Sequence, residues 1–314
     1  MRKMTMITSI RKGIFFAVLA AVLYAINAPF SKIVLEQIPP ILMAGFLYIG
    51  SALAMLMVGG ARLLHGRIGL EKKLEEKEWP YVLGMIVLDM AAPICLMIGL
   101  KSTTAENASL LCNFEVVVTA LIALLFFKEK ISRRLWVGIL FVTVSCCVLS
   151  FEDTDSFVFS KGSIFVILSA ICWGLDNNCT KMISDKDPLQ IVLLKGLVSG
   201  SCSLVVGFMM GEWIENWWFV VAALVIGAVS YGFSVYVDIY AQRYLGAART
   251  SAYYAISPFI ATGLSLLIFQ QIPPKVYWIG LVLMAIGAWL CSRDTPLINI
   301  NPNRSMEKKE KREK

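Results

Sequence analysis

Four ionisable side chains stand inside long apolar stretches of this 314-residue chain. Asp89 and Glu115 lie close to the middle of their stretches, and Asp176 and Lys195 lie somewhat off the middle of theirs. In a chain this apolar, such positions lie at membrane depth, where an ionised side chain costs at least about 2.5–3.5 kcal/mol and therefore asks for a reason. These side chains could form a polar cavity that binds an amine or a carboxylate, or that takes up and releases a proton. The alternative is that Lys195 neutralises one acid as a structural ion pair.

A second group of polar side chains could complete such a site. Asn177 follows Asp176 directly and adds hydrogen-bonding groups to the same helical turn. Tyr231 and Tyr254 lie deep in their stretches, and a tyrosine offers an apolar ring and a hydroxyl to an organic ligand or cation. Asparagine also holds transmembrane helices together and tyrosine also marks membrane interfaces, so both roles stay open. The candidate substrate-binding residues are Asn27, Asp89, Glu115, Asp176, Asn177, Lys195, Tyr231 and Tyr254.

The sequence offers little for metal, cofactor or catalytic chemistry. The single histidine, His65, stands in a charged segment, and none of the eight cysteines forms a C-x-x-C pair. Metal sites need thiolates or imidazoles at fixed spacing, so we expect no bound metal, and free cysteines that pack as small apolar side chains. There is no Walker-type phosphate loop, which argues against ATP-driven work. We expect no cofactor and no enzymatic activity.

The elements that must position these side chains are apolar helices. The chain is 58% hydrophobic and 16% charged, and its mean hydropathy is +0.71. An average soluble domain is roughly 45–50% apolar and 25% charged, so a water-soluble enzyme is excluded. Runs of about 20 apolar residues predict membrane-spanning helices. The predicted spans are 13–34, 41–63, 79–100, 104–127, 134–151, 162–183, 189–210, 217–240, 250–269 and 276–292.

The net charge of +7 gathers at the two ends of the chain, and residues 13–292 are neutral. With the N-terminus inside, 24 lysines and arginines fall in inner segments and four in outer ones. This bias predicts that both termini lie in the cytoplasm. Because the positive charge is explained by membrane orientation, it does not indicate binding to nucleic acid. A weak attraction to anionic lipid is expected at the ends. The charged stretch Glu71–Glu78 predicts a surface helix.

An internal repeat is the strongest pattern in the sequence. The motif Asn27-x4-Lys32-x3-Glu36-x2-Pro39 returns as Asp176-x4-Lys181-x3-Asp185-x2-Pro188, at an offset of 149 residues. The two lysines lie near the ends of their helices, where an anchoring role and a gating role both stay open. Residues 108–138 match residues 250–280 at an offset of 142. Asp89 and Asp238 also lie 149 residues apart, but the spans around them align at 142, so we interpret that match as coincidence.

Each repeat holds five spans, an odd number, so the two halves must cross the bilayer in opposite directions. Inverted repeats are typical of transporters that bind substrate near the midplane between the halves. The predicted fold is an all-α integral membrane protein with ten transmembrane helices in two inverted five-helix repeats. The predicted divisions are a cytoplasmic N-terminus (1–12), the first repeat (13–151), an extracytoplasmic linker (152–161), the second repeat (162–292) and a disordered basic cytoplasmic tail (293–314).

The chain resembles a known family over residues 15–292. The motifs are Trp173-Gly174 with Asp176 and Lys181, then Ala247-x3-Ser251, Pro258 and Trp278-x-Gly280. Together they are similar to the EamA-type branch of the drug/metabolite transporter superfamily. The resemblance implies a pseudo-twofold ten-helix carrier that exports amino acids, other metabolites or drugs. It also implies a central cavity lined by the first, third, fourth, sixth, eighth and ninth spans.

Two positions depart from the family pattern. Tyr24-Ala25 replaces the aromatic–glycine pair in the first half, and Glu115-Val116 stands where the second half has its proline. An acid at the point where the helices cross favours a functional role for Glu115, including proton coupling.

The sequence therefore predicts a secondary transporter of the cytoplasmic (plasma) membrane that exports small organic metabolites such as amino acids. It would work by alternating access around a midplane cavity. The expected partners are a small-molecule substrate, membrane lipid and protons as coupling ion, with the chain acting as a monomer or homodimer. A multidrug or organic-cation exporter is the first alternative, and a scramblase, membrane-embedded enzyme or receptor is the second.

Overall fold

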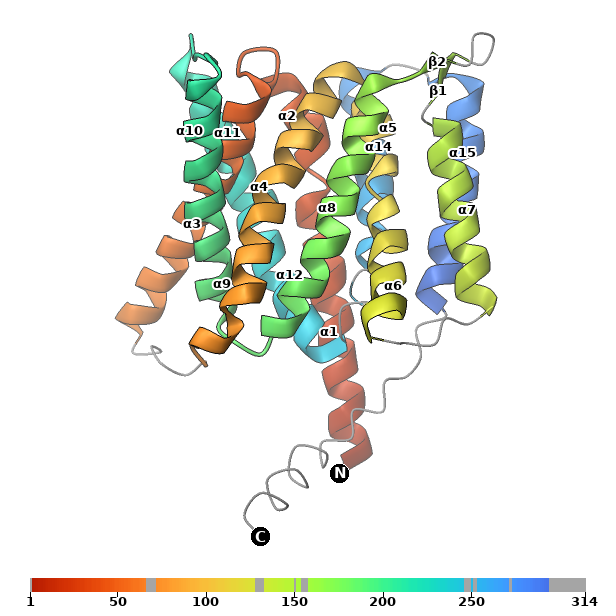
Figure 1. The fold of residues 1–314 in the computed structure, drawn as a ribbon. Helices are drawn as coiled ribbons and strands as arrows, with labels where there is room; N and C mark the ends of the chain where they lie inside the picture. Colours follow the sequence, from red (N-terminus) through yellow and green to blue (C-terminus); the bar gives the residue numbers. More distant parts are fainter. Residues whose placement is uncertain are drawn as a thin grey trace.

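Helices make up almost all of the described chain and run roughly along one common direction (Figure 1). This computed structural model describes residues 2–65, 72–127, 133–149, 151–153, 158–245, 250, 253–270 and 273–293. The first helix begins at Arg2, so residues 2–12 of the predicted N-terminal segment belong to this helix, which projects beyond its neighbours (Figure 1). The predicted tail beyond Arg293 lies outside the described residues.

The first half of the chain follows the predicted apolar stretches closely. Its helices are α1 (Arg2–Tyr24), α2 (Asn27–Val34), α3 (Pro40–Leu64), α4 (Trp79–Ser102), α5 (Ala105–Leu111), α6 (Phe114–Phe127) and α7 (Arg133–Leu149). Between α3 and α4, the charged stretch 71–78 was predicted as a surface helix. Within its described part, only the 3-10 turn Glu76–Glu78 is helical, which corrects that prediction.

The second half follows a short hairpin at the predicted linker. Strands β1 (Phe151–Asp153) and β2 (Val158–Phe159) pair antiparallel. The helices that follow are α8 (Lys161–Ile183), α9 (Pro188–Leu194), α10 (Gly200–Met209), α11 (Trp217–Gly227), α12 (Ser234–Leu245), α14 (Ser257–Phe269) and α15 (Lys275–Arg293).

Three predicted spans are interrupted near their middles, which the sequence did not predict. Turns at Ala25–Ile26 and Cys112–Asn113 separate α1 from α2 and α5 from α6. A third turn at Ala255–Ile256 precedes α14, whose first turn contains Pro258. A proline is tolerated there because its missing N–H would have no partner in the helix. At each interruption, some backbone groups are not used in regular helical hydrogen bonds, so they and the neighbouring side chains can make other contacts.

Two further spans contain wide helical turns. The π-helical segment Lys195–Ser199 joins α9 to α10, and Ala228–Phe233 joins α11 to α12. Such segments add a residue to the turn and change the direction in which the following side chains point, and they occur frequently at functional sites. Lys195 and Tyr231 belong to these segments, and both are buried.

Six helical stretches among the described residues are long and apolar enough to cross a membrane. They are Ile10–Val34, Pro40–Leu64, Glu76–Ser102, Ala105–Ile122, Pro188–Met209 and Trp217–Leu245. Helix α8 has 23 residues, but its run Asp176–Asn178 lowers its hydropathy. Shorter apolar helices cover Trp136–Leu149, Ser257–Phe269 and Lys275–Leu290. The chain is therefore a multi-pass membrane protein built from helices.

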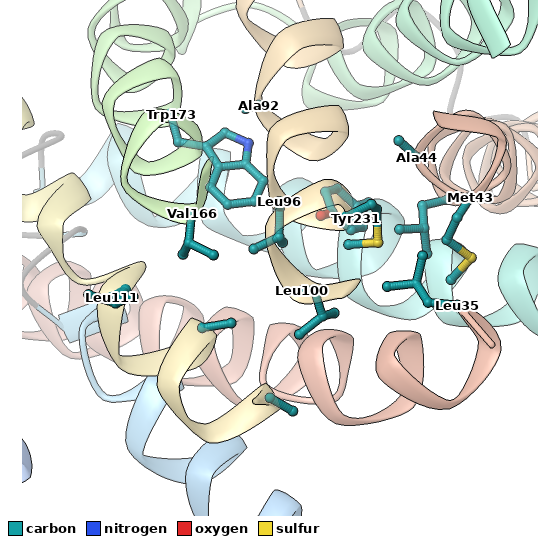
Figure 2. Close-up of a cluster of buried hydrophobic side chains, with 14 of the residues drawn as sticks. Leu35, Met43, Ala44, Ala92, Leu96, Leu100, Leu111, Val166, Trp173 and Tyr231 are labelled. Atoms are coloured by element: carbon teal, nitrogen blue, oxygen red, sulfur yellow. The ribbon is translucent and has the colours of Figure 1, made fainter. Parts of the chain in front are cut away.

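Apolar side chains lie on both the inside and the outside of the helical assembly. Met57, Val225 and Leu267 point outward and are well exposed, as expected for helices that face lipid. Inside, a continuous core joins α3, α4, α5 and α8. Figure 2 shows Leu96 and Val166 in this core, with Trp173 and Tyr231 at the same cluster.

The most extensive packing joins helices from opposite halves of the sequence. Helix α4 packs on α8, α1 on α12, α7 on α15, and α3 on both α10 and α11. Figure 1 shows the α7–α15 pair side by side at one edge and α3 with α10 and α11 at the other. The halves are interleaved, so a site between them can draw side chains from many helices.

Helix α3 contacts α11 backbone to backbone through two glycines. A Cβ added at Gly227 would lie 2.0 Å from the carbonyl oxygen of Leu47, and one at Gly50 would lie 2.1 Å from that of Leu224. Only glycine allows the two helices to approach so closely.

We therefore expect Gly227→Ala to destabilise the protein by about 1–3 kcal/mol or more, because the two backbones must separate. The measurement is the thermal unfolding midpoint in detergent. Gly60→Ala is the matched control, because a Cβ at Gly60 in α3 meets no atom within 4 Å. Equal midpoints for the two variants would contradict this account of the contact.

Candidate functional site

A polar cavity lies between the two halves, close to the interrupted helices and the wide turns. It encloses about 700 Å³ of empty space, counting the part that opens outward. The residues that line it are Tyr24, Tyr48, Ser51, Asp89, Glu115, Trp173, Asp176, Asn177, Thr180, Val192, Lys195, Tyr231, Val235, Asp238, Gln242 and Tyr254. We call this the main cavity.

Lys195 joins two carboxylates at one side of the main cavity. Its Nζ lies 2.7 Å from Oδ2 of Asp89 and donates to Oδ2 of Asp176 at 2.6 Å. Tyr48 donates from its hydroxyl to Oδ1 of Asp89 at 2.8 Å, and Thr180 donates to Oδ1 of Asp176 at 3.3 Å. All three charged side chains are at most 6% exposed. The ion bridge ties α4, α8 and the π-helical segment after α9 together.

The bridge leaves the main cavity with an excess of acidic groups. Two more carboxyls line it, and each has an amide as its partner. Asn177 donates to Oε1 of Glu115 at 2.5 Å, and Gln242 donates to Oδ2 of Asp238 at 2.8 Å. The lining therefore holds four carboxyls and one ammonium. A buried carboxylate without a cation is costly, so these acids can accept a proton or a cationic group of a ligand.

Aromatic rings form another wall of the main cavity. The ring centroid of Tyr24 lies 5.9 Å from that of Trp173, 5.8 Å from that of Tyr231 and 5.6 Å from that of Tyr254. The ring of Tyr48 lies 5.0 Å from that of Tyr231. Rings at these separations give a rigid apolar surface with hydroxyls at its edge, which suits the apolar or aromatic part of an organic ligand.

The cavity collects all of the candidate residues except Asn27. Asn27 stands behind the wall, where its Nδ2 donates to the hydroxyl of Tyr231 at 3.2 Å and its Oδ1 accepts from Ser31 at 3.0 Å. It positions a lining residue and does not itself line the space. Its repeat partner Asp176 does line it.

Sequence reasoning missed several lining residues. Asp238 shares the 149-residue offset with Asp89, and both line the same cavity. Tyr48 and Ser51 come from α3, and Val192 and Lys195 from α9 and the segment after it, so the second and seventh spans contribute beyond the set that the family resemblance implied. Tyr24 and Trp173 also lie 149 residues apart, the offset of the first repeat motif, and their rings meet at this wall.

The ammonium of Lys32 caps the C-terminus of α4. It donates to the carbonyl oxygen of Leu100 at 2.5 Å and to that of Thr103 at 2.7 Å. A cation at the C-terminus of a helix is favoured by the helix dipole. Of the two roles that the sequence allowed for Lys32, anchoring and gating, these contacts support anchoring.

The opposite end, where α8 leads into α9, carries a denser polar network. Arg62 donates to both oxygens of Asp187, at 2.9 and 3.1 Å, and to the hydroxyl of Tyr236 at 2.6 Å. Arg243 donates to the carbonyl oxygens of Ser184 at 3.1 Å and Lys186 at 2.7 Å. These contacts join α3 and α12 to the α8–α9 connection, so this end is held by side chains from both halves.

Lys186 adds ion pairs to the same end. Its ammonium is 3% exposed and lies 2.9 Å from Oε1 of Glu75 and 3.0 Å from Oε1 of Glu78. Hydrogen bonds from Lys77 and Lys186 lower the pKa of Glu75 to about 2, so this carboxyl stays ionised at neutral pH. The segment before α4 is thereby attached to the connection between α8 and α9.

The seven cysteines with described side chains are free, and two of them, Cys147 and Cys202, are exposed and so depart from the expected burial. Over the described part of the chain, no group of three or more His, Cys, Asp or Glu side chains could hold a metal ion.

The comparisons with known proteins agree with a membrane transport fold. The family model described as the EamA-like transporter family matches residues 11–151 and 160–293. An uncharacterized transporter of Methanothermobacter thermautotrophicus is 24% identical over 292 residues, which is 88% of this chain and 85% of that relative. The uncharacterized transporter YyaM of Bacillus subtilis is 22% identical over 213 residues, which is 62% of this chain and 67% of that relative.

A solved structure shares the fold. It is described only as a crystal structure of a protein, and it matches with a TM-score of 0.64 at 17% identity, over 90% of this chain and 96% of that chain. At this identity the likeness concerns the arrangement of the helices alone.

Proposed function

This chain belongs to the EamA-like transporter family, and from that premise we propose that it is a secondary transporter that exports a small organic metabolite, such as an amino acid. The observation that carries the proposal is the main cavity, which places acidic, amide and aromatic side chains of both halves around one space. A cavity of this kind between helices is the usual form of a small-molecule site.

The architecture that we propose is ten transmembrane helices in two inverted repeats, residues 13–151 and 162–292. The family model matches the chain in two stretches of similar extent, which supports this division. The packing supports it as well. The third proposed span of each half packs on the first span of the other half, α4 on α8 and α12 on α1, and the two fifth spans, α7 and α15, pack on each other.

Transport would proceed by alternating access, with each half rocking against the other around the main cavity. At one end, the contacts of Arg62 with Asp187 join the two halves, and opening that end would require these contacts to break.

We place the protein in the cytoplasmic membrane with both termini in the cytoplasm, because of the excess of lysine and arginine in the segments assigned to that side. The partners proposed are a small-molecule substrate, membrane lipid and the proton as coupling ion. A proton suits a site in which Glu115 and Asp238 have amide partners and no bridging cation among the described residues. We propose a monomer or homodimer that binds no nucleic acid.

The test is solute flux through the purified protein in liposomes. Labelled amino acids and labelled organic cations are supplied as two pools, and uptake is measured with and without an imposed pH gradient. Flux of amino acids supports the proposal, and flux of cations alone favours the organic-cation exporter that the acidic lining also suits. Flipping of lipid headgroups without any solute flux would instead identify a scramblase.

A further inference from the structure

A second, smaller cavity lies next to the main cavity. It holds about 290 Å³ of empty space, counting the part that opens outward, and is lined by the turns that interrupt the fourth and ninth predicted spans. Tyr24, Glu115 and Tyr254 line both cavities and so form the partition between them. Asn113 and Ser257 line only the second cavity.

Two buried polar atoms at this second cavity have no hydrogen-bond partner among the described residues. They are Nδ2 of Asn113 and Oγ of Ser257. Asn113 is 3% exposed and Ser257 is 1% exposed. Leaving a buried polar group unpaired costs about 1–3 kcal/mol, so two of them around one space call for a ligand that completes their hydrogen bonds.

The start of a helix adds to the same chemistry. Helix α14 has 13 residues and begins at Ser257, and its first turn is left without a side-chain cap in the described structure. Helix α6 has 14 residues and begins at Phe114, beside Asn113. The N-terminus of a helix carries a partial positive charge and favours a negative group. In transporters with interrupted helices, such ends point at anionic groups of the substrate.

The main cavity has no free cation for an anionic group in the described chain. Its one lining ammonium, Lys195, already contacts Asp89 and Asp176. A substrate carboxylate placed there would meet an excess of acidic groups. The neutral donors of the second cavity are therefore the better place for it, and Glu115 in the partition can face the positive group of the same molecule.

We propose that the second cavity is the carboxylate subsite for an α-amino acid in its zwitterionic form. The carboxylate accepts hydrogen bonds from Asn113 and Ser257, the ammonium faces Glu115, and the side chain of the amino acid extends among the rings of the main cavity. The inference rests on the proposed transport function, and it adds the place where the substrate carboxylate binds and two residues that bind it.

The test compares amino acids with the amines that lack the carboxylate. Proteoliposomes receive either the twenty labelled L-amino acids as a pool or the matching pool of their decarboxylated amines. For Ser257→Ala and for Asn113→Asp, we expect amino acid uptake to fall at least tenfold while uptake of any amine stays within about twofold of its wild-type level. Asn113→Asp keeps the shape of the side chain but replaces a donor by an anionic acceptor, which repels the substrate carboxylate.

The matched controls are Ser265→Ala and Thr119→Val. Both residues are buried on the same two helices, both hydroxyls lack a partner among the described residues, and neither lines either cavity. We expect both controls to transport amino acids at the wild-type level. Thermal unfolding in detergent checks folding: ligand-free Ser257→Ala should unfold no earlier than wild type, because it removes an unpaired buried group, and it should lose the rise in midpoint that amino acids produce.

The possible outcomes separate the inference from the proposed function. If amino acid and amine uptake fall together, or if neither falls, Asn113 and Ser257 do not recognise the substrate carboxylate and the inference is overturned. If the wild type carries amines but no amino acid, the inference is also overturned while the transport function stands. If the wild type carries no solute from either pool, the proposed function fails and the inference with it.

Discussion

Replacing Lys195 by methionine should be the most damaging single change in the main cavity. Lys195 is the one ammonium among the described lining residues, and its removal leaves Asp89 and Asp176 buried without their shared cation. Removing one partner from a buried ion pair costs about 3–5 kcal/mol, because the remaining charge stays unpaired. We expect a large fall in the thermal unfolding midpoint in detergent and loss of transport in liposomes.

A rescue experiment distinguishes this electrostatic cause from lost packing. The triple variant Lys195→Met, Asp89→Asn, Asp176→Asn removes the unpaired charges together with the lysine, so we expect it to recover most of the unfolding midpoint. Transport should not return, because the polar groups that face the cavity have changed. A triple variant as unstable as the single one would show that the charge bridge is not what holds these helices together.

The second large effect is expected for Glu115→Gln. The new side chain can still accept the hydrogen bond from Asn177, but an amide cannot take up or release a proton. If Glu115 carries the coupling proton, uptake driven by a pH gradient should fall at least tenfold. Counterflow without a pH gradient should fall less than gradient-driven uptake, since that exchange needs no net proton transfer and loses only the contact between Glu115 and the substrate ammonium.

The control for this change is Glu36→Gln, which alters an exposed carboxyl just after α2 that does not line the main cavity. It should leave gradient-driven uptake unchanged. Asp89→Asn is measured in parallel, because Asp89 is the other deep acid for which the sequence suggested proton coupling. Full pH-gradient-driven transport by both Glu115→Gln and Asp89→Asn would rule out coupling through these acids.

Much of the helical framework could be predicted from the sequence, because apolar runs of membrane length leave few alternatives to helices. The runs at 41–63 and 162–183 correspond to α3 and α8 within two residues at each end. One alternative from the sequence paired Lys195 with a single acid, whereas in the structure its ammonium contacts two carboxylates, those of Asp89 and Asp176. That contact depends on how α4 and α8 pack, which hydropathy does not encode.

The wide turns explain a second gap between sequence and structure. The π-helical segment Lys195–Ser199 changes how α9 is aligned with α10, so a regular helix through 189–210 would orient Lys195 differently relative to the side chains of α10. The same holds for Tyr231 in the segment Ala228–Phe233. Nothing in residue type alone marks where an extra residue enters a turn. The second cavity was missed for a related reason, since Asn113 and Ser257 meet only because two separate spans are interrupted at facing positions.

The glycine contacts along α3 also bear on how the molecule can move. Gly227 and Gly196 each bring another helix against the backbone of α3, and at such contacts there are no long side chains that could change rotamer. At a junction of this kind, one helix can rotate against the other, but the two helices resist sliding past each other along their axes. The larger displacements of a transport cycle would then fall at contacts made by side chains that can exchange partners, such as those of Arg243 with the carbonyl oxygens of Ser184 and Lys186.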